Sequence, residues 1–314
     1  MLSVGSREMV FFKRRKSAET GLLGMEISPN GIALAQVQRA AGQAPRLLCC
    51  EFREAAPTLH AATLKAMVAE FNLAGLPVNL LLHPADYRIF LLEAPDVPAE
   101  ELRDAMRWRV KDMLGEPLDS VVLDCFLLPP DAYRGRHRMA YCAVLDKRRM
   151  NECGELLRQA GLRLESIDIT EMAFRNIALL AGVADGVNVA VLRLRSSEGL
   201  ICIQNGDALY LARRLEHGVG DGARNLAGMT LEIQRTLDYF ESQLGVGHIG
   251  RLLLLPLKHD GDTARQELAS SLDVTLQGMD LRELFPGQPA AGLAEARQAH
   301  CIGAVGAALR QDAR

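Results

Sequence analysis

The sequence predicts an α/β protein with two domains, and three observations support this prediction. Apolar segments with the periods of strands and of helices alternate along the chain, which is the pattern of an α/β fold. The chain has 314 residues, more than a single compact core usually holds. Two segments, residues 23–37 and 188–211, share a plan of strand, turn and strand about half a chain apart. Their recurrence indicates duplicated halves.

The first of these segments contains a compact series of turn residues. Residues 24–28 and 32–37 have the pattern of strands, and Pro29, Asn30 and Gly31 supply the chemistry of a tight turn between them. The second segment repeats the plan with strands at residues 189–194, 200–203 and 209–211. Polar residues 195–199 and an Asn-Gly-Asp turn at 205–207 connect these strands.

Apolar periodicity, helix caps and turn residues place the remaining elements in order. The expected strands span residues 47–52, 78–82, 87–92, 121–128, 139–145, 162–169, 252–255 and 274–276. The expected helices span residues 58–72, 98–114, 147–160, 170–180, 225–244, 263–272 and 291–309. The buried face of the first helix is expected to hold Leu59, Ala62, Ala66 or Met67, and Phe71. Gly303 and Gly306 in the last helix allow a close backbone approach.

The composition excludes several classes of protein. Hydrophobic residues make up 49% of the chain and charged residues of both signs 24%, which is typical of globular domains. The formal net charge of −3 argues against a nucleic-acid binder, for which a basic face dominates affinity. Seven cysteines without metal-ligand spacing favour a reducing compartment and predict no metal site.

The N-terminal residues bear on localisation. No apolar stretch approaches the roughly 20 residues of a spanning helix, and no signal peptide is recognised, so we expect a cytoplasmic protein. Residues 1–20 are expected to form a flexible tail, in which two aromatic residues at 11–12 precede four cations at 13–16. Such a segment can make a weak contact with an anionic membrane surface, and a solvated tail is the other interpretation.

The only tryptophan of the chain falls on the polar face of a predicted helix. The apolar stripe of that helix is Leu102, Met106, Val110, Met113 and Leu114. At 100° per residue Trp108 lies away from this stripe, between Arg107 and Lys111. Trp108 either packs under a neighbouring subdomain or belongs to a docking surface with Arg107 and Lys111, because Trp and Arg are enriched at interface hot spots.

Several segments in order resemble the PilM family, the cytoplasmic proteins of type IV pilus assembly, and most closely its MshI branch from the mannose-sensitive haemagglutinin pilus. The resembling segments are Gly24-Met25-Glu26-Ile27-Ser28, Met106-Arg107-Trp108, Pro117-Leu118-Asp119, Val121-Val122-Leu123-Asp124, Leu156-Leu157-Arg158-Gln159-Ala160-Gly161-Leu162, Glu232-Ile233-Gln234-Arg235-Thr236-Leu237-Asp238-Tyr239-Phe240 and Ile302-Gly303-Ala304-Val305-Gly306. Together they cover most of the chain.

The resemblance implies an α/β actin-like (ribonuclease H-like) fold of two domains. Residues 21–86 and 146–182 would form the first domain, 87–145 a small inserted α+β subdomain, and 183–314 the second domain. It also implies a partner, the N-terminal cytoplasmic tail of a PilN-like inner-membrane protein, gripped near the first domain and the inserted subdomain. A pilus motor ATPase is a second candidate partner, and the expected location is the cytoplasmic side of the inner membrane.

The resemblance also permits a comparison with the nucleotide site of actin-like ATPases. These enzymes use an Asp-x-Gly pattern in each hairpin to organise magnesium, water and phosphate. Glu26 and Ser28 stand at the first pattern here, and counting back from the turn at 205–206 places Leu192 and Leu194 at the second. The residues expected to remain from such a site are Glu26, Ser28, Asn30, Ser196, Ser197, Glu198 and Gly303.

Other catalytic patterns are absent from the sequence. The glycine-rich residues 218–222 lack the Lys-Ser/Thr ending of a P-loop and are expected to be a flexible connector, and no metalloprotease or hydrolase motif occurs. We therefore expect a scaffold with no catalytic residues and no cofactor. The alternative is a Mg-ATP-binding switch or slow ATPase in which Glu26 and Glu198 replace the lost aspartates. A carbohydrate kinase is more distant, since no sugar-binding carboxylate is evident.

Overall fold

The computed structural model describes residues 21–40, 42–182, 186–220, 223–259, 261–287 and 289–311. The predicted N-terminal tail lies outside these residues, and so does its proposed membrane contact. The strands are β1 Leu22–Ser28, β2 Gly31–Gln38, β3 Arg46–Glu54, β4 Pro77–Leu81, β5 Tyr87–Glu93, β6 Val121–Leu127, β7 Met139–Asp146, β8 Arg163–Asp168, β9 Asn188–Leu194, β10 Gly199–Asn205, β11 Ala208–Leu215, β12 Ile249–Leu254 and β13 Thr275–Gly278. The helices are α2 His60–Glu70, α3 Ala99–Leu114, α4 Lys147–Gln159, α5 Thr170–Leu180, α6 Ala223–Tyr239, α7 Gly261–Ser271, α8 Leu281–Leu284 and α9 Glu295–Ala308.

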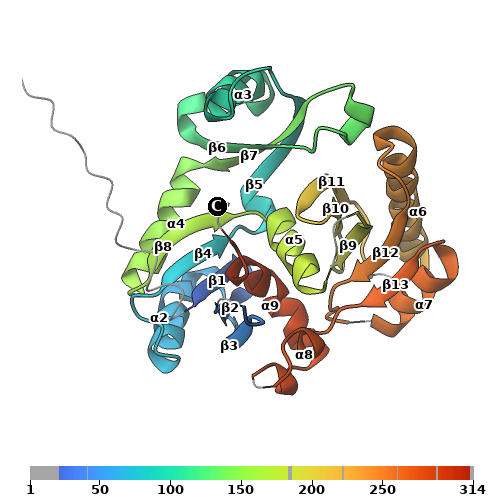
Figure 1. Ribbon diagram of the computed structural model, residues 1–314. Helices are drawn as coiled ribbons and strands as arrows, with labels where there is room; N and C mark the ends of the chain where they lie inside the picture. Colours follow the sequence, from blue (N-terminus) through green and yellow to red (C-terminus); the bar gives the residue numbers. More distant parts are fainter. Residues whose placement is uncertain are drawn as a thin grey trace, which may run out of the picture.

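Two five-stranded sheets have the same topology (Figure 1). Their orders are β3-β2-β1-β4-β8 and β11-β10-β9-β12-β13. In each sheet the first three strands of the half are antiparallel neighbours, and the last two add in parallel. The predicted duplication of the halves is therefore visible in the strand order.

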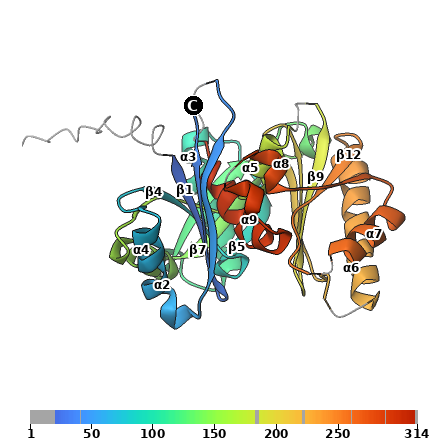
Figure 2. The same ribbon diagram turned by 90° about the horizontal axis from the view of Figure 1, so that it is seen from below.

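Two helices lie between the sheets (Figure 2). Helix α9 packs on β1, β2 and β4 of the first sheet, whereas α5 packs on β9 and β10 of the second, and the two helices contact each other. The expected boundaries assigned α9 to the second domain, whereas in the structure it packs on β1, β2 and β4 and its buried residues join one core with both sheets. Helices α2 and α4 cover the outer face of the first sheet, and α6 and α7 that of the second.

Glycines allow the close contact between α9 and β1. A Cβ atom on Gly24 would lie 2.0 Å from the carbonyl oxygen of Ala304. A Cβ atom on Gly306 would lie 2.4 Å from the carbonyl oxygen of Ala173 in α5. The expected close approach at Gly306 thus joins α9 to α5, and Gly24 seats α9 on the first sheet.

The inserted residues between β4 and α4 form a three-stranded antiparallel sheet, β5-β7-β6, covered on one face by α3. The inserted residues reach the second domain through several polar contacts. Tyr210 donates to Asp131 over 2.8 Å, the Ala212 amide donates to the Tyr141 hydroxyl over 2.9 Å, and Arg134 donates to the Ser242 carbonyl over 2.5 Å. The small sheet therefore contacts both domains.

The predicted buried faces of two helices, α2 and α3, were wrong in part. Leu59 is 56% exposed and Ala62 is exposed, while Leu64, Met67 and Val68 are buried. The cause is the start of α2 at His60, after a short 3₁₀ turn, which rotates the apolar face.

In α3, Met113 is exposed although it was expected in the apolar stripe. The narrow three-stranded sheet buries only residues at four-residue spacing, namely Leu102, Met106, Val110 and Leu114. Helix α8 was not predicted, because four residues are too few to show a periodicity.

The described part of the chain contains no helix that is long and apolar enough to cross a bilayer. Five of the seven cysteines are buried and the other two are half-buried, and none forms a disulfide. This agrees with the prediction that they serve as small apolar residues.

Candidate functional site

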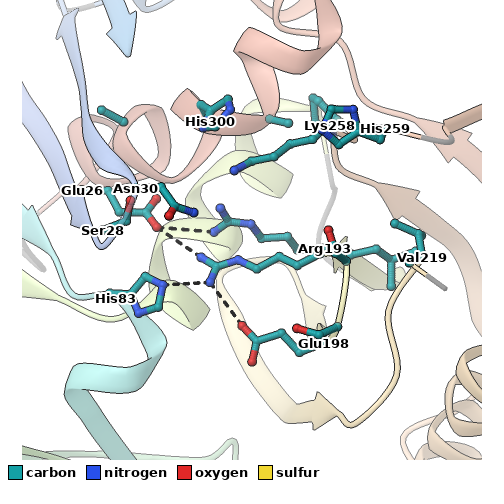
Figure 3. A pocket seen from close by; sticks show the side chains of 18 of the residues that line it. Glu26, Ser28, Asn30, His83, Arg193, Glu198, Val219, Lys258, His259 and His300 are labelled. Carbon is teal, nitrogen blue, oxygen red and sulfur yellow. Dashed lines mark hydrogen bonds and ion pairs between the residues drawn. The ribbon is translucent and has the colours of Figure 1, made fainter. Parts of the chain in front are cut away.

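A cleft of about 410 Å³ lies between the two hairpins that the sequence singled out (Figure 3). The structure brings together six of the expected remnants on its wall: Glu26, Ser28, Asn30, Ser196, Ser197 and Glu198. Gly303 lies directly behind the first hairpin, because a Cβ atom there would stand 2.3 Å from Oε2 of Glu26. Helix α9 thus packs against the Glu26 carboxylate itself.

Glu26 is buried and its carboxylate faces arginines from the second hairpin. Its Oε1 accepts from Nη2 of Arg195 over 3.3 Å and lies 3.9 Å from Nη1 of Arg193. Its Oε2 has no hydrogen-bond partner among the described residues. Arg195 also pairs with Glu198 over 3.2 Å and with the ring of His83 over 3.0 Å. These contacts join the two domains across the cleft (Figure 3).

Arg193 and Arg195 are cleft residues that the sequence reasoning did not include among the candidate site residues. The motif count placed Leu192 at the acidic position, but Leu192 is fully buried in the core and does not line the cleft. Arg193, the next residue along β9, lines the cleft. Leu194, the other residue singled out, does line the cleft. The available signal was Arg193 within the otherwise apolar residues 189–194, followed directly by Arg195.

The charges in the cleft depress the pKa of several basic groups. Burial, and then the charges of Arg193 and Arg195, lowers the pKa of Lys258. Burial lowers the pKa of Arg193 itself to about 10. Burial, with Lys258 and Arg193, lowers the pKa of His300 to about 4, and burial followed by Arg195 lowers that of His83. Both histidines are therefore uncharged at neutral pH.

The hairpin residues do not fit a magnesium ion held between two carboxylates. The first hairpin presents Glu26, whose accepting oxygen is already used by Arg195. In the second hairpin the residue equivalent to Glu26 is Leu192, and the residues that face the Glu26 carboxylate are Arg193 and Arg195. No group of three or more His, Cys, Asp or Glu side chains that could hold a metal ion occurs in the described ranges. A divalent cation beside Glu26 would be repelled by the guanidinium groups of Arg193 and Arg195.

The glycine-rich residues after β11 are attached to the second hairpin. The amides of Val219 and Gly220 donate to the carbonyl oxygens of Arg195 and Ser196 over 2.9 and 2.8 Å. A Cβ atom on Gly218 would lie 2.2 Å from the Arg195 carbonyl oxygen. Over residues 218–220 the expected flexible connector is a backbone layer that supports the hairpin turn.

A second hollow, a groove of about 690 Å³, lies beside the inserted subdomain. One wall is residues 124–130, from β6 onward, and the other is residues 167–169 at the end of β8. Both β6 and β8 are at the edges of their sheets among the described strands. Met172 and Arg175 of α5 form the floor. The groove combines apolar side chains with two strand edges that lack a neighbour on one side.

The predicted docking residues lie elsewhere on the inserted subdomain. Trp108 is 67% exposed, and Nζ of Lys111 lies 5.6 Å from the centre of its ring. Arg107 donates to the Leu118 carbonyl oxygen over 3.0 Å and pairs with Asp119 over 3.2 Å. None of the three predicted docking residues lines the groove. The expectation that Trp108 packs under a neighbouring subdomain is wrong, because most of its side chain faces solvent.

No protein-family model matches the sequence, and no curated protein matches it. Solved structures do match. A PilM–PilN type IV pilus biogenesis complex aligns with a TM-score of 0.67 at 22% identity, over 92% of this chain and 96% of that chain. A Bacteroides thetaiotaomicron protein of unknown function with an actin-like ATPase fold aligns with a TM-score of 0.51 at 14% identity, over 93% and 99%. The chain has an actin-like fold. Both alignments cover nearly the whole chain, so the actin-like description applies to the two domains together with the inserted subdomain.

Proposed function

We propose that this chain is a non-catalytic, actin-like scaffold of a type IV pilus assembly machine, of the MSHA type, that docks the N-terminal cytoplasmic tail of a PilN-like bitopic membrane protein. The observation that carries the proposal is the groove between β6 and β8, in a chain that aligns over almost its full length with a PilM–PilN complex. The scaffold would work at the cytoplasmic face of the inner membrane and link the membrane platform to the pilus motor.

The groove suits an extended peptide. A strand edge offers backbone N–H and C=O groups, and a peptide that adds to the edge gains main-chain hydrogen bonds. Side chains such as Phe126, Met172 and Ile169 supply apolar pockets for alternate residues of the peptide. Pro129 and Pro130 follow β6 and limit the pairing at that end, because proline lacks an N–H group.

Charge at the groove favours a peptide that carries basic residues. Asp124 and Asp207 are exposed at the wall. Asp168 pairs with Arg310 over 3.2 Å and is therefore already neutralised. A basic tail would add ion pairs at the rim and raise the association rate more than the affinity.

The docking proposal is tested with a synthetic N-terminal peptide of the neighbouring pilus membrane protein, titrated by fluorescence anisotropy. Met172→Glu places an unpaired charge on the groove floor and should weaken binding about tenfold or more, equivalent to about 1.4 kcal/mol. Leu231→Glu, at an exposed apolar residue of α6 that does not line the groove, is the matched control and should leave affinity unchanged. Equal affinity of Met172→Glu, with a native thermal midpoint, would remove the groove from the interface.

Trp108→Ala tests whether the partner also covers the outer face of α3. We predict weaker peptide binding without unfolding, because an exposed tryptophan with a cation over its ring is a typical interface anchor. Unchanged affinity with native stability would exclude Trp108 from the interface and leave the groove as the sole docking candidate.

The alternative is an ATP-binding switch or slow ATPase that uses Glu26 and Glu198. It requires both carboxylates to leave Arg195, since a metal ion and a guanidinium would compete for the same oxygens. Phosphate release that is abolished by Glu26→Gln and Glu198→Gln would favour this alternative. Under the scaffold proposal we expect no hydrolysis above background and no micromolar binding that depends on magnesium.

A further inference from the structure

The interdomain cleft encloses more positive than negative charge. Arg193, Arg195 and Lys258 contribute cations, and Glu26 and Glu198 contribute carboxylates. His300 and His83 add no further positive charge at neutral pH, because their lowered pKa leaves them neutral. An enclosed cation without a counter-charge is unfavourable, so this arrangement favours an anion in the cleft.

Arg193 shows the clearest unmet interaction. It is only 8% exposed, and its Nη1 has no hydrogen-bond partner in the described part of the chain. The distance of 3.9 Å to Glu26 is an ion-pair contact that is too long for a hydrogen bond. Lys258 extends its amine into the same space (Figure 3). Two charged donors thus converge on the cleft from different segments of the second domain.

We propose that the cleft binds a phosphate-bearing anion without a divalent cation, with Arg193 and Lys258 as its charged donors. Arginine and lysine are the side chains that most often hold phosphate. The hydroxyl groups of Ser196 and Ser197 line the same wall and add neutral donors. The volume of about 410 Å³ is within the range of small-molecule sites. Docking a membrane partner does not require this ligand, so the inference goes beyond the scaffold role.

Glu26 would act against the anion in such a site. Its carboxylate holds Arg195 and faces Arg193, so it competes with a phosphate for the same guanidinium groups. Replacing the carboxylate with an amide of the same shape removes this competition. A magnesium-nucleotide site would respond in the opposite way, because loss of the metal-facing acid weakens it.

The experiment is calorimetry on the full chain with inorganic tripolyphosphate, ADP and uncharged adenosine, each in EDTA and in excess magnesium. Tripolyphosphate or ADP should bind in EDTA, and excess magnesium should weaken binding about fivefold, because it neutralises the ligand. Glu26→Gln should tighten binding about tenfold. Lys258→Ala should weaken binding about tenfold, whereas Lys65→Ala, an exposed lysine on α2, should have no effect.

The comparison of tripolyphosphate with ADP also distinguishes two sources of the phosphate group. Binding of both probes indicates recognition of phosphate alone, and binding of ADP alone indicates recognition of a nucleotide; either supports the proposal. No binding in EDTA, a requirement for magnesium, or weaker binding by Glu26→Gln would overturn it. Thermal midpoints of each variant confirm that it is folded. Peptide docking is a separate measurement, so the two proposals fail independently.

Discussion

The β1–β2 and β9–β10 hairpins occupy equivalent places in two sheets of the same order, yet they carry opposite charges to the cleft. The first presents Glu26, Ser28 and Asn30, and the second presents Arg193 and Arg195. The sheet positions correspond closely, since Glu26 pairs with Leu81 near the end of β4 and Leu192 pairs with Leu254 near the end of β12. The two hairpins therefore share a backbone arrangement but carry side chains of complementary charge.

The difference shows how a fold can retain its geometry while its chemistry changes. In the described structure the domains are joined across the cleft by the chain's own ion pairs, from Glu26 to Arg195 and Arg193. Behind the hairpins the helices also differ, because α9 approaches β1 through Gly24, whereas the equivalent residue on β9 is Ala190, which already has a side chain. The contact between helix and sheet is therefore closer in the first half of the molecule than in the second.

The largest effect on stability is expected from placing an acid in the second hairpin at Leu192, the residue equivalent to Glu26. Leu192→Glu should destabilise the protein by about 4 kcal/mol or more, because the new carboxylate would lie in the core without a partner. Leu192→Met conserves volume and should cost less than about 1.5 kcal/mol. Chemical denaturation measures both. A small loss for Leu192→Glu would mean that the side chain reaches the cleft.

Removing the acid from the first hairpin should have the next largest effect. Glu26→Gln leaves Arg193 buried without its counter-charge and should destabilise the protein by about 3 kcal/mol. The control is Glu198→Gln, whose partly exposed ion pair with Arg195 is expected to contribute less than about 1 kcal/mol. Equal losses in urea unfolding would contradict the assignment of Glu26 as the central bridge.

The smallest expected effect concerns His300, which stacks on Phe52 at 3.8 Å and faces the positive second half. Its pKa falls from 6.5 to about 4 on folding. The unfolded chain therefore takes up the proton first, and stability is lost as pH falls through this window. His300→Gln should reduce the slope of unfolding free energy between these pH values.

Lys258→Ala should raise the pKa of His300, because it removes one of the charges that lower it. An NMR titration of the imidazole protons measures this shift directly. An unchanged pKa would show that burial alone depresses the titration and that the charge of the second hairpin does not extend to α9.

Much of the fold could be predicted from the sequence. The strands and most helices follow from local periodicity, and α5 spans the predicted 170–180. The side chain of Asp146 caps α4, as predicted, by accepting from the amides of Arg148 and Arg149. Helix faces were less predictable at α2, since a short 3₁₀ turn changed the phase of its apolar residues.

The candidate site was predicted only in part for a different reason. Glu26, Ser28 and Asn30 of the first hairpin could be predicted because they are close neighbours in the sequence. Arg193 was missed because the motif count considered only Leu192 and Leu194 on this strand, whereas the residue between them makes the contact with Glu26 across the cleft. The groove could not be predicted from the sequence, because its walls come from β6, β8 and α5, which are separated along the chain.

The sequence by itself determined the alternation of strands and helices, the duplicated hairpins and the absence of an Asp-x-Gly pattern in either of them. These are local properties, set by turn residues and by the periods of apolar side chains. Only the tertiary structure decided that Arg193 and Arg195 face Glu26, that α9 packs on the first sheet, and that two strand edges border one groove. Those facts depend on contacts between distant segments, which form when the two sheets pack around α5 and α9.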